Sequence, residues 1–526
     1  PTAPTTFPRT EAVMGFLVDA RIVTRALDRF RRRAARRQGP VVSQPPIEQL
    51  VLDLDLEGHA RRGGLSGRPL ARFLERYLDS STRLHHPGYM AHQVAVPHPS
   101  GSIAAMVDGF TNNAMAIYEM GPAAAAVEFW VLNWMIRKVG WSPMPYPRET
   151  ASPGTAQDAP CAGGVLTHGG SLANLTALLA ARSRMAPDAW DHGVPADLAL
   201  LVPAESHYSV ARAAGILGLG SAAVFSLETD DTGRIIPGRI RDRLRAVREA
   251  GRRPMALVAN ACSTALGLYD HLREIGEICR DEGVWMHVDG AHGASALLSA
   301  RTRGLLDGVE LADSMVWDAH KLLRAPTLCA AVLLRDGRDL DRAFKQEASY
   351  LFHDKAQPGV DFIHRTVECT KAGLGLRFFS VLAALGEEGL ARYVQRQVDL
   401  AREAHAWISG LAGFECPAVP QSNILCFRTA GPDELQIAAR DALIAEGSFH
   451  LSTAEVNGRR WLRAAFMNPD TTMQDVARMI ERVRVAAQAA QAAQAGQAAQ
   501  AGQAAQAGQA AQASRRPAVG AGAAGT

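Results

Sequence analysis

The chain has 526 residues, 47% hydrophobic and 21% charged, a composition typical of a folded globular enzyme and not of a disordered chain. Its formal net charge of +3 is too small to predict a nucleic-acid partner, and no apolar run reaches the roughly 18–20 residues that a membrane span needs. The seven cysteines are scattered and lack the CxxC spacing of a zinc site. We therefore expect no disulfide framework, no bound metal and a reducing, cytoplasmic compartment.

The first hundred residues are predicted to form an N-terminal helical arm. Helical periodicity runs through residues 14–80 and is interrupted at Gly39-Pro40 and at Pro45-Pro46. A segment at residues 85–92, HHPGYMAH, follows and is rich in side chains that could line a pocket. We assign the arm to residues 1–100.

Residues 101–380 are predicted to form a large domain. A helical pattern over residues 104–139 is followed by seven short apolar runs that alternate with helical stretches. This alternation is typical of an α/β fold in which helices cover a mainly parallel, doubly wound, seven-stranded sheet. The predicted strands are residues 164–166, 198–203, 222–226, 255–259, 284–289, 314–317 and 330–334.

The C-terminal part is predicted to contain a small domain and a tail. Residues 381–486 mix helical patterns with short strands at residues 424–427 and 461–466, which indicates a small α/β domain. The repeat that follows contains only Ala, Gln and Gly, so it has no large apolar side chain to bury. Alanine favours helix but glycine at regular intervals weakens it, so we predict that residues 487–526 are a disordered tail with transient helix.

Two predicted strands end on side chains that suit one cofactor. Asp289 ends the strand at residues 284–289, and Lys321 follows the strand at residues 314–317, thirty-two positions later (321 − 289). Parallel strands of an open α/β sheet bring their ligand-binding residues to the same edge. A carboxylate that can pair with a ring nitrogen and an amine that can react with an aldehyde together predict pyridoxal phosphate (PLP).

Other strand ends could supply the remaining contacts. Gly169-Gly170-Ser171 lies between a strand and a helix, where glycines let the backbone approach an anion such as the cofactor phosphate. His207 follows another strand and could lie flat against an aromatic ring, while Ala291 would leave room on the opposite face. Thr264 supplies a hydroxyl at the same edge.

The motifs TxGGSxAN, SHYS, HVDxAxG, ADS and DxHK, with the Ser263-Thr264 pair, occur in this order along the chain. They resemble the group II PLP-dependent amino-acid decarboxylases, which include the glutamate, cysteine sulfinate and aromatic L-amino-acid decarboxylases. SHYS, GRIIP at residues 233–237 and YLF at residues 350–352 are closer to the glutamate and cysteine sulfinate branch. The resemblance implies a PLP-dependent transferase fold of the aspartate aminotransferase type (fold type I). It also implies a homodimer with a shared active site.

The resemblance also implies roles for individual residues. Lys321 would form the Schiff base with PLP, Asp289 would keep the pyridine nitrogen protonated, and His207 would stack on the ring opposite Ala291. These three residues, Lys321, Asp289 and His207, would be the catalytic ones. The implied cofactor-binding set is Gly170, Ser171, His207, Thr264, Asp289, Ala291, Asp318, His320 and Lys321.

An L-amino acid is the substrate that the resemblance implies, decarboxylated to an amine and CO2. Arg463 would pair with the substrate carboxylate, because its planar fork matches a carboxylate in a way that lysine does not. We also expect His86 and His92, from the segment rich in pocket-lining side chains, to contact the substrate.

One position departs from the family pattern. Family members carry a tyrosine on a mobile loop that helps return a proton to Cα, and an ungapped match places Val360 there. Loss of that tyrosine is associated with an aldehyde product, so an aldehyde synthase that uses oxygen is one alternative. A second alternative is a binding subunit that keeps the fold without catalysis, and the retained Lys321, Asp289 and His207 argue against it.

Overall fold

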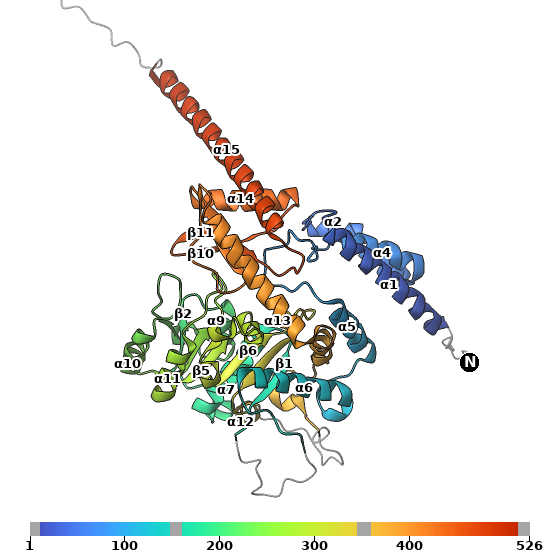
Figure 1. Cartoon of the computed structure of the whole chain (residues 1–526), viewed down its shortest axis with the longest axis vertical. Helices are drawn as coiled ribbons and strands as arrows, with labels where there is room; N and C mark the ends of the chain where they lie inside the picture. The colour runs from blue at the N-terminus through green and yellow to red at the C-terminus, as the bar shows by residue number, and fades with distance from the viewer. Residues whose placement is uncertain (1–10, 148–159, 345–358, 514–526) are drawn as a thin grey trace, which may run out of the picture.

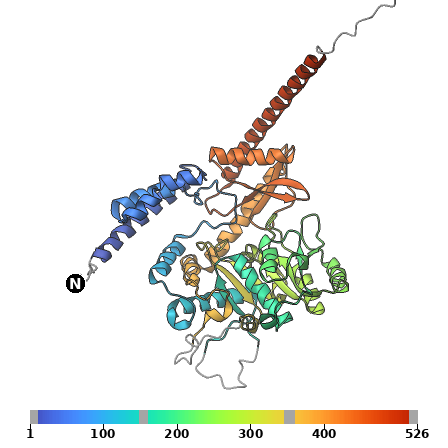
Figure 2. The same cartoon turned by 180° about the vertical axis from the view of Figure 1, so that it is seen from behind.

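A computed structural model of the protein describes residues 11–147, 160–344 and 359–513. Figures 1 and 2 show a helical N-terminal region, a large domain built on a seven-stranded sheet, and a smaller domain built on a four-stranded sheet. None of the described helices combines the length and the apolar character that a membrane crossing requires.

The large sheet is mainly parallel, as predicted. Its strand order is β1-β7-β6-β5-β4-β2-β3, and all neighbours from β6 to β3 pair in parallel. Only β7 runs antiparallel, to both β1 and β6. The seven predicted apolar runs correspond to these strands, which are β1 (Gly163–Thr167), β2 (Leu198–Pro203), β3 (Val224–Leu227), β4 (Arg253–Asn260), β5 (Trp285–Asp289), β6 (Ser314–Asp318) and β7 (Ala330–Leu334).

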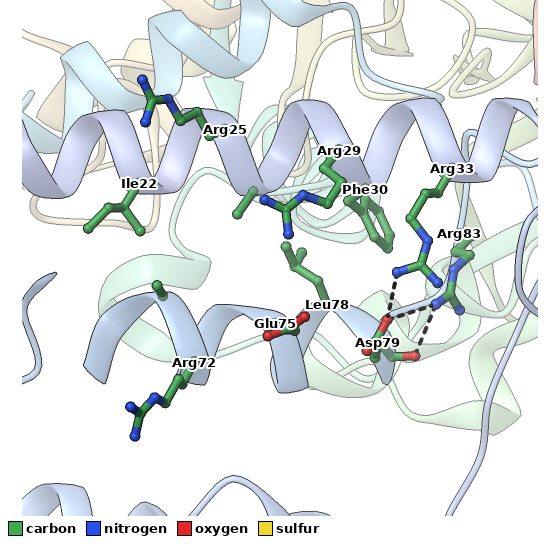
Figure 3. A pocket seen from close by; sticks show the side chains of 12 residues that line it. Ile22, Arg25, Arg29, Phe30, Arg33, Arg72, Glu75, Leu78, Asp79 and Arg83 are labelled. Carbon is green, nitrogen blue, oxygen red and sulfur yellow. Dashed lines mark hydrogen bonds and ion pairs between the residues drawn. The ribbon is translucent and has the colours of Figure 1, made fainter. Parts of the chain in front are cut away.

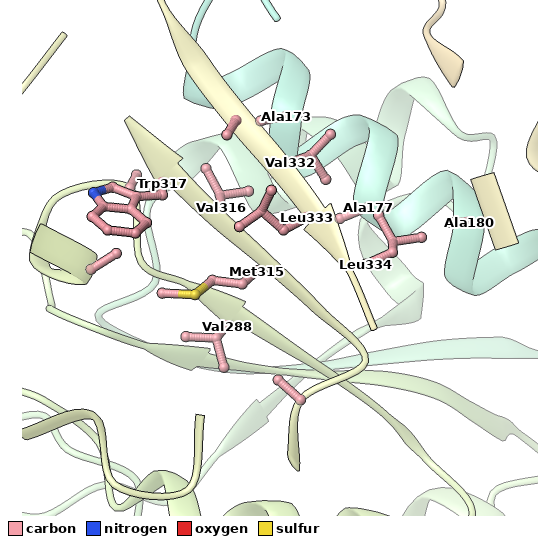
Figure 4. Packing of buried hydrophobic residues seen from close by; sticks show 14 of the residues in the cluster. Ala173, Ala177, Ala180, Val288, Met315, Val316, Trp317, Val332, Leu333 and Leu334 are labelled. Atoms are coloured by element: carbon pink, nitrogen blue, oxygen red, sulfur yellow. The ribbon is translucent and has the colours of Figure 1, made fainter. Parts of the chain in front are cut away.

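The central strands are buried on both faces. Every residue of β1, β5, β6 and β7 is buried, which requires that helices cover both sides of the sheet because side chains alternate between its faces. Figure 4 shows Ala173, Ala177 and Ala180 of α7 beside Val332 and Leu334 of β7. These small side chains share one face of α7, so the helix can pack closely against the strands. The helices of this domain are α6 (Pro122–Val139), α7 (Gly170–Met185), α8 (Ala189–His192), α9 (Tyr208–Ile216), α10 (Ile240–Glu249), α11 (Leu272–Glu282) and α12 (Arg338–Ala343).

The smaller domain has an antiparallel sheet in the order β10-β11-β9-β8. The long helix α13 (Leu374–Ile408) leads from the large domain to this sheet and contains a kink at Gly386, where φ is 69°. The domain limit predicted at residue 381 therefore falls inside a helix, which gave no loop signal in the sequence. The other elements are β8 (Phe414–Glu415), β9 (Ile424–Thr429), α14 (Asp433–Glu446), β10 (Ser452–Val456) and β11 (Arg459–Ala465).

The N-terminal region is helical, with α1 and α4 packed side by side. Figure 3 shows the cavity between them, where Arg33 and Arg83 approach Asp79 at 3.7 and 3.5 Å. The predicted limit at residue 100 also lies inside a helix, α5, and not in a loop. The helices of the region are α1 (Glu11–Ala35), α2 (Ile47–Asp53), α3 (Leu56–Arg62), α4 (Gly67–Asp79) and α5 (Pro99–Thr111).

The part of the predicted tail up to residue 513 is helical in the structure. Helix α15 (Met473–Ala513) continues through the Ala/Gln/Gly repeat and projects away from the small domain. Each glycine of the repeat is separated from the next by five residues of Ala and Gln, and the high helix propensity of alanine outweighs a glycine cost of about 1 kcal/mol. Residues 514–526 lie outside the described part of the chain.

A buried ion pair joins α6 to the segment that precedes α13. Lys371 Nζ lies 2.5 Å from Glu128 Oε2, and neither side chain is exposed. Burial raises the pKa of Glu128, while Lys371 opposes that shift. We expect Lys371→Met to lower the free energy of unfolding by about 3–5 kcal/mol, because it leaves an unpaired carboxylate in the core.

Urea denaturation of purified variants measures this cost. The double variant Glu128→Gln/Lys371→Met removes both charges and should regain most of the lost stability. Lys138→Met is the surface control, since its pair with Glu387 is partly exposed and should be worth less than about 1 kcal/mol. A loss below about 1 kcal/mol in Lys371→Met would contradict the expectation.

Candidate active site

A cavity of about 350 Å³ lies at the carboxyl edge of the large sheet. It is bounded by residues at the ends of β1, β4, β5 and β6 and by the first turn of α7, because strands that run in the same direction end at the same edge. All the cofactor-binding residues expected from the sequence line it, namely Gly170, Ser171, His207, Thr264, Asp289, Ala291, Asp318, His320 and Lys321.

Lys321 follows β6 and reaches the cavity beside Asp318. Its Nζ lies 3.1 Å from Asp318 Oδ2, and the Asp318 side chain is almost fully buried. The other carboxylate oxygen, Asp318 Oδ1, has no hydrogen-bond partner among the described residues. His320 is oriented by a contact with the backbone of Cys329, whose carbonyl oxygen lies 2.9 Å from His320 Nδ1. The cavity therefore holds an amine next to a carboxylate.

The glycine turn between β1 and α7 forms another wall. Gly169 has a φ of 105°, a conformation that favours glycine. A Cβ added to Gly170 would come within 2.8 Å of Asp318 Oδ2, so no larger residue fits there. The turn ends at the N-terminus of the 16-residue helix α7, whose first N–H groups have no acceptor within the helix and favour an anion.

Asp289, at the end of β5, is held by two hydrogen bonds. Its Oδ2 accepts from Asn174 Nδ2 at 3.0 Å and its Oδ1 accepts from the backbone N–H of Ala291 at 3.2 Å. The carboxylate is thus fixed in direction before any ligand arrives. Such fixed orientation is what a group needs if it is to bind a charged ring nitrogen.

His207 caps the N-terminus of α9. Its Nδ1 accepts the backbone N–H of Ser209 at 3.3 Å and lies 2.7 Å from Ser209 Oγ. Burial lowers the pKa of His207, while Asp289 opposes the shift. The imidazole is therefore a neutral ring in the cavity wall, which suits stacking better than ion pairing.

The residues expected to bind the substrate do not all lie at the cavity. Arg463, on β11, is almost fully buried and donates from Nε to the carbonyl oxygen of Thr264 at 3.0 Å. Its Nη2 has no hydrogen-bond partner within the described part of the chain. His92 is exposed and its ring centre lies 5.5 Å from that of His450, whereas the adjacent Gln93 lines the cavity.

His86 does not face the cavity of Lys321. It lines a separate cavity together with Arg37 and Asp475, and its Nδ1 accepts the N–H of Gly88 at 2.9 Å. Within one chain His86 therefore lies apart from the cavity of Lys321, and its contact with the substrate stays a prediction.

Several residues of the cavity wall were not expected from the sequence. His168 lies 2.5 Å from Glu368, and Asn174 holds Asp289 from within α7. Asn174 could have been suspected because it stands in a helix turn that follows the glycine motif. Asn260 and Cys262 end the same predicted strand as Thr264, so their place at this edge could be expected, whereas Gln93 and His292 gave no signal of their own.

The cavity fits pyridoxal phosphate. The Nδ2 donor of Asn260 is buried in the wall without a partner among the described residues, so it can serve an acceptor on a ligand. Gly170 lies at the N-terminus of α7, where a phosphate is favoured, and Lys321 supplies the amine for an aldehyde. Fold and cavity together define a PLP-dependent enzyme.

Comparison with known proteins gives the family. Residues 79–430 match the family model described as the pyridoxal-dependent decarboxylase conserved domain. The mouse acidic amino acid decarboxylase GADL1 is 30% identical over 461 residues, which is 84% of this chain and 80% of the relative. The mouse cysteine sulfinic acid decarboxylase is 31% identical over 392 residues, 73% of this chain and 74% of the relative.

The solved structure of mouse CSAD in its apo form is also similar. It superimposes with a TM-score of 0.77 at 26% identity and covers 89% of this chain and 98% of that one. The chain belongs to the pyridoxal-dependent decarboxylase family. It has the predicted type I fold, uses PLP, and catalyses the decarboxylation of an L-amino acid.

Two buried histidines make stability depend on pH. Burial lowers the pKa of His287 to about 4 and that of His292 to about 3, both from 6.5. The unfolded chain therefore binds more protons than the folded one between pH 6.5 and about 3 to 4. We expect the free energy of unfolding to be highest above pH 6.5 and to fall as the pH decreases through this window. Each histidine should contribute about 1.4 kcal/mol for every pH unit by which burial lowers its pKa.

Urea denaturation at a series of pH values between 3.5 and 8, on the order of half a unit apart, measures this dependence. His292→Asn should flatten the curve, because it removes a group that must stay neutral in the fold. His192→Gln changes an exposed histidine and serves as the control. Stability that rises on acidification would contradict the assignment.

Proposed function

We propose that Lys321 is the residue that holds the cofactor covalently and that its cavity is where decarboxylation takes place. The single observation that carries the proposal is the meeting of Lys321, Asp289 and His207 in one cavity at the carboxyl edge of the sheet. When bound there, PLP supplies an electron sink for the charge left when the Cα–carboxylate bond breaks.

The residues of the cavity would divide the work of binding and orientation. Asp289 keeps a proton on the ring nitrogen, and His207 presents a neutral ring face. Gly170, Ser171 and His320 hold the phosphate, aided by the N-terminus of α7. Reduction of the holoenzyme with borohydride, followed by peptide mass mapping, should place the cofactor on Lys321. Its recovery on another lysine would refute the assignment.

We propose an L-amino acid with an acidic side chain as the substrate. Both curated relatives described above act, by their names, on acidic or cysteine sulfinic acids. Arg463, whose buried guanidinium has a spare donor and lies beside Thr264 of the cavity wall, is available to bind a carboxylate of the substrate. Rates should therefore be higher with L-aspartate, L-glutamate or L-cysteine sulfinate than with L-2,4-diaminobutyrate or aromatic amino acids. The reverse order would overturn the substrate class.

An aldehyde synthase is the second candidate function, and it rests on Val360. This residue packs against the hydrophobic core of the large domain and has no proton to give. If no other group delivers a proton to Cα, oxidation of the decarboxylated substrate by O2 would compete with amine release. O2 would be reduced to hydrogen peroxide, and hydrolysis would release aldehyde and ammonia.

We propose that the protein acts as a homodimer whose partner completes the active site. Large apolar side chains stand exposed on the N-terminal helices, including Leu17 on α1, Ile47 on α2 and Phe110 on α5. Contiguous exposed apolar surface is typical of a protein interface. Sedimentation should give about twice the chain mass of 56.3 kDa. An active monomer would exclude the shared site.

We also propose a cytoplasmic location. The support is the state of the seven cysteines, all of which are free in the structure. Free thiols persist where the environment is reducing. Fractionation of cells with an antibody against the protein tests this location.

A further inference from the structure

We propose that Asn174 and His287 are positioning residues, which aim Asp289 and His207 through one hydrogen-bond chain whose direction is fixed at every link. The inference rests on the proposed roles of Asp289 and His207 at the cofactor ring. Neither Asn174 nor His287 is among the predicted site residues; Asn174 lies in the cavity wall, and His287 is fully buried and lies 2.9 Å from it.

The orientation of the Asn174 amide follows from its neighbour Asp289. Asn174 Nδ2 lies 3.0 Å from Asp289 Oδ2, and the opposite orientation would place two acceptors, an amide oxygen and a carboxylate oxygen, against each other. The amide oxygen must then face His287, whose Nε2 is 2.9 Å away. His287 therefore carries its proton on Nε2 and donates it to Asn174.

The other end of the chain is consistent with the same direction. Trp285 Nε1 can only donate, and it donates to Ser314 Oγ at 2.8 Å. The hydroxyl proton of Ser314 is then free for His287 Nδ1, also at 2.8 Å. Burial lowers the pKa of His287 to about 4, so the ring is neutral and has one acceptor nitrogen. Because the Asn174 end places the proton on Nε2, the acceptor is Nδ1, and the Ser314 hydroxyl can donate to it.

A branch from Asn174 reaches the second ring-contacting residue. Asn174 Nδ2 also donates to Ser209 Oγ at 2.9 Å, and this hydroxyl lies 2.7 Å from His207 Nδ1. Ser209 N–H donates to the same nitrogen. His207 Nδ1 is thus an acceptor, and the proton of this neutral imidazole resides on Nε2. A single amide holds both the carboxylate and the imidazole.

Each residue of this hydrogen-bond network is buried and must supply a particular donor or acceptor. Asn174, His287, Ser314 and Ser209 are each at most 2% exposed, and each makes its hydrogen bonds in the network to protein atoms. An aspartate at position 174 would offer Asp289 an acceptor, and a leucine would offer it nothing. Either change leaves Asp289 with only the N–H of Ala291 to aim it.

Cofactor binding to the apoenzyme tests the inference without relying on turnover. The probes are PLP and its 1-deaza analogue, in which carbon replaces the ring nitrogen, and quenching of tryptophan fluorescence reports both affinities. Wild-type protein should prefer PLP by about tenfold or more, because a charge-assisted hydrogen bond to the nitrogen is lost in the analogue. In Asn174→Leu this preference should fall to about twofold, with the affinity for the analogue almost unchanged.

Thr176→Val is the matched control. Thr176 lies on the same helix, is fully buried, and bonds only within α7, to the carbonyl oxygen of Leu172. Its substitution should leave the preference of about tenfold intact. If Asn174→Leu does not fold by circular dichroism, Ser314→Ala replaces it, since loss of one hydroxyl should still reduce the preference by about twofold to threefold.

Two results would overturn the inference, and they differ. If Asn174→Leu weakens PLP and the 1-deaza analogue equally, Asn174 is a packing residue and the positioning role is refuted while that of Asp289 stands. If wild-type protein itself binds both probes equally, the proposed contact between Asp289 and the ring nitrogen is wrong. The positioning role then fails with it.

Discussion

Lys321→Ala is expected to lower the rate of decarboxylation by a factor on the order of 10³ or more while leaving the fold intact. Lys321 supplies the amine of the cavity and lies 3.1 Å from Asp318, and no other described lysine lines that cavity. Loss of the amine removes the covalent attachment of the cofactor. The substrate amine then has no lysine to displace from the cofactor. The measurement is the initial rate at saturating PLP, together with the absorbance spectrum.

Lys138→Ala is the control for this experiment. Lys138 lies on α6 and pairs with Glu387, away from the cavity, so its removal should leave the rate unchanged. The circular-dichroism spectrum of Lys321→Ala should equal that of the wild type. Retention of more than about a tenth of the wild-type rate would contradict the role of Lys321.

Asp289→Asn is expected to reduce kcat by about 10²–10³-fold. The substitution preserves shape but removes the negative charge that would keep the ring nitrogen protonated, and so weakens the electron sink. Asn174 Nδ2 donates to Asp289 Oδ2 at 3.0 Å, and this hydrogen bond is kept when the amide oxygen of the new asparagine faces Asn174. Steady-state kinetics at saturating PLP give the effect.

Asp313→Asn provides a matched loss of a buried carboxylate. Asp313 precedes β6 at the opposite edge of the same sheet and pairs with Arg184 and Arg335. Its substitution should lower stability without lowering the rate per folded molecule. Equal kcat values for Asp289→Asn and the wild type would remove Asp289 from the mechanism.

The fold could be predicted well from the sequence because its strands are buried on both faces. Such strands are continuous apolar runs, and the run at residues 284–289 stands out as clearly as any of the others. Asp289 and Lys321 could be predicted to meet because parallel strands end at one edge. Neither inference needs a contact between distant segments.

What could not be predicted depends on such contacts. Asn174 belongs to a helix and His287 to a strand, and only the fold brings them within 2.9 Å. His86 was predicted to reach the substrate because its segment is rich in polar side chains, but it faces another cavity. The continuity of the helix beyond residue 487 could not be predicted because an alanine repeat and a disordered linker have similar composition.

The measurement that tests the account most directly is product analysis with purified, PLP-loaded protein. Acidic, cationic and aromatic L-amino acids labelled with ¹³C at the carboxyl carbon would be supplied, and CO2, amine, aldehyde and hydrogen peroxide followed together. The account predicts labelled CO2 and an equal amount of amine from an acidic substrate, without peroxide. Aldehyde with peroxide, or no CO2 from any member of the panel, would contradict it.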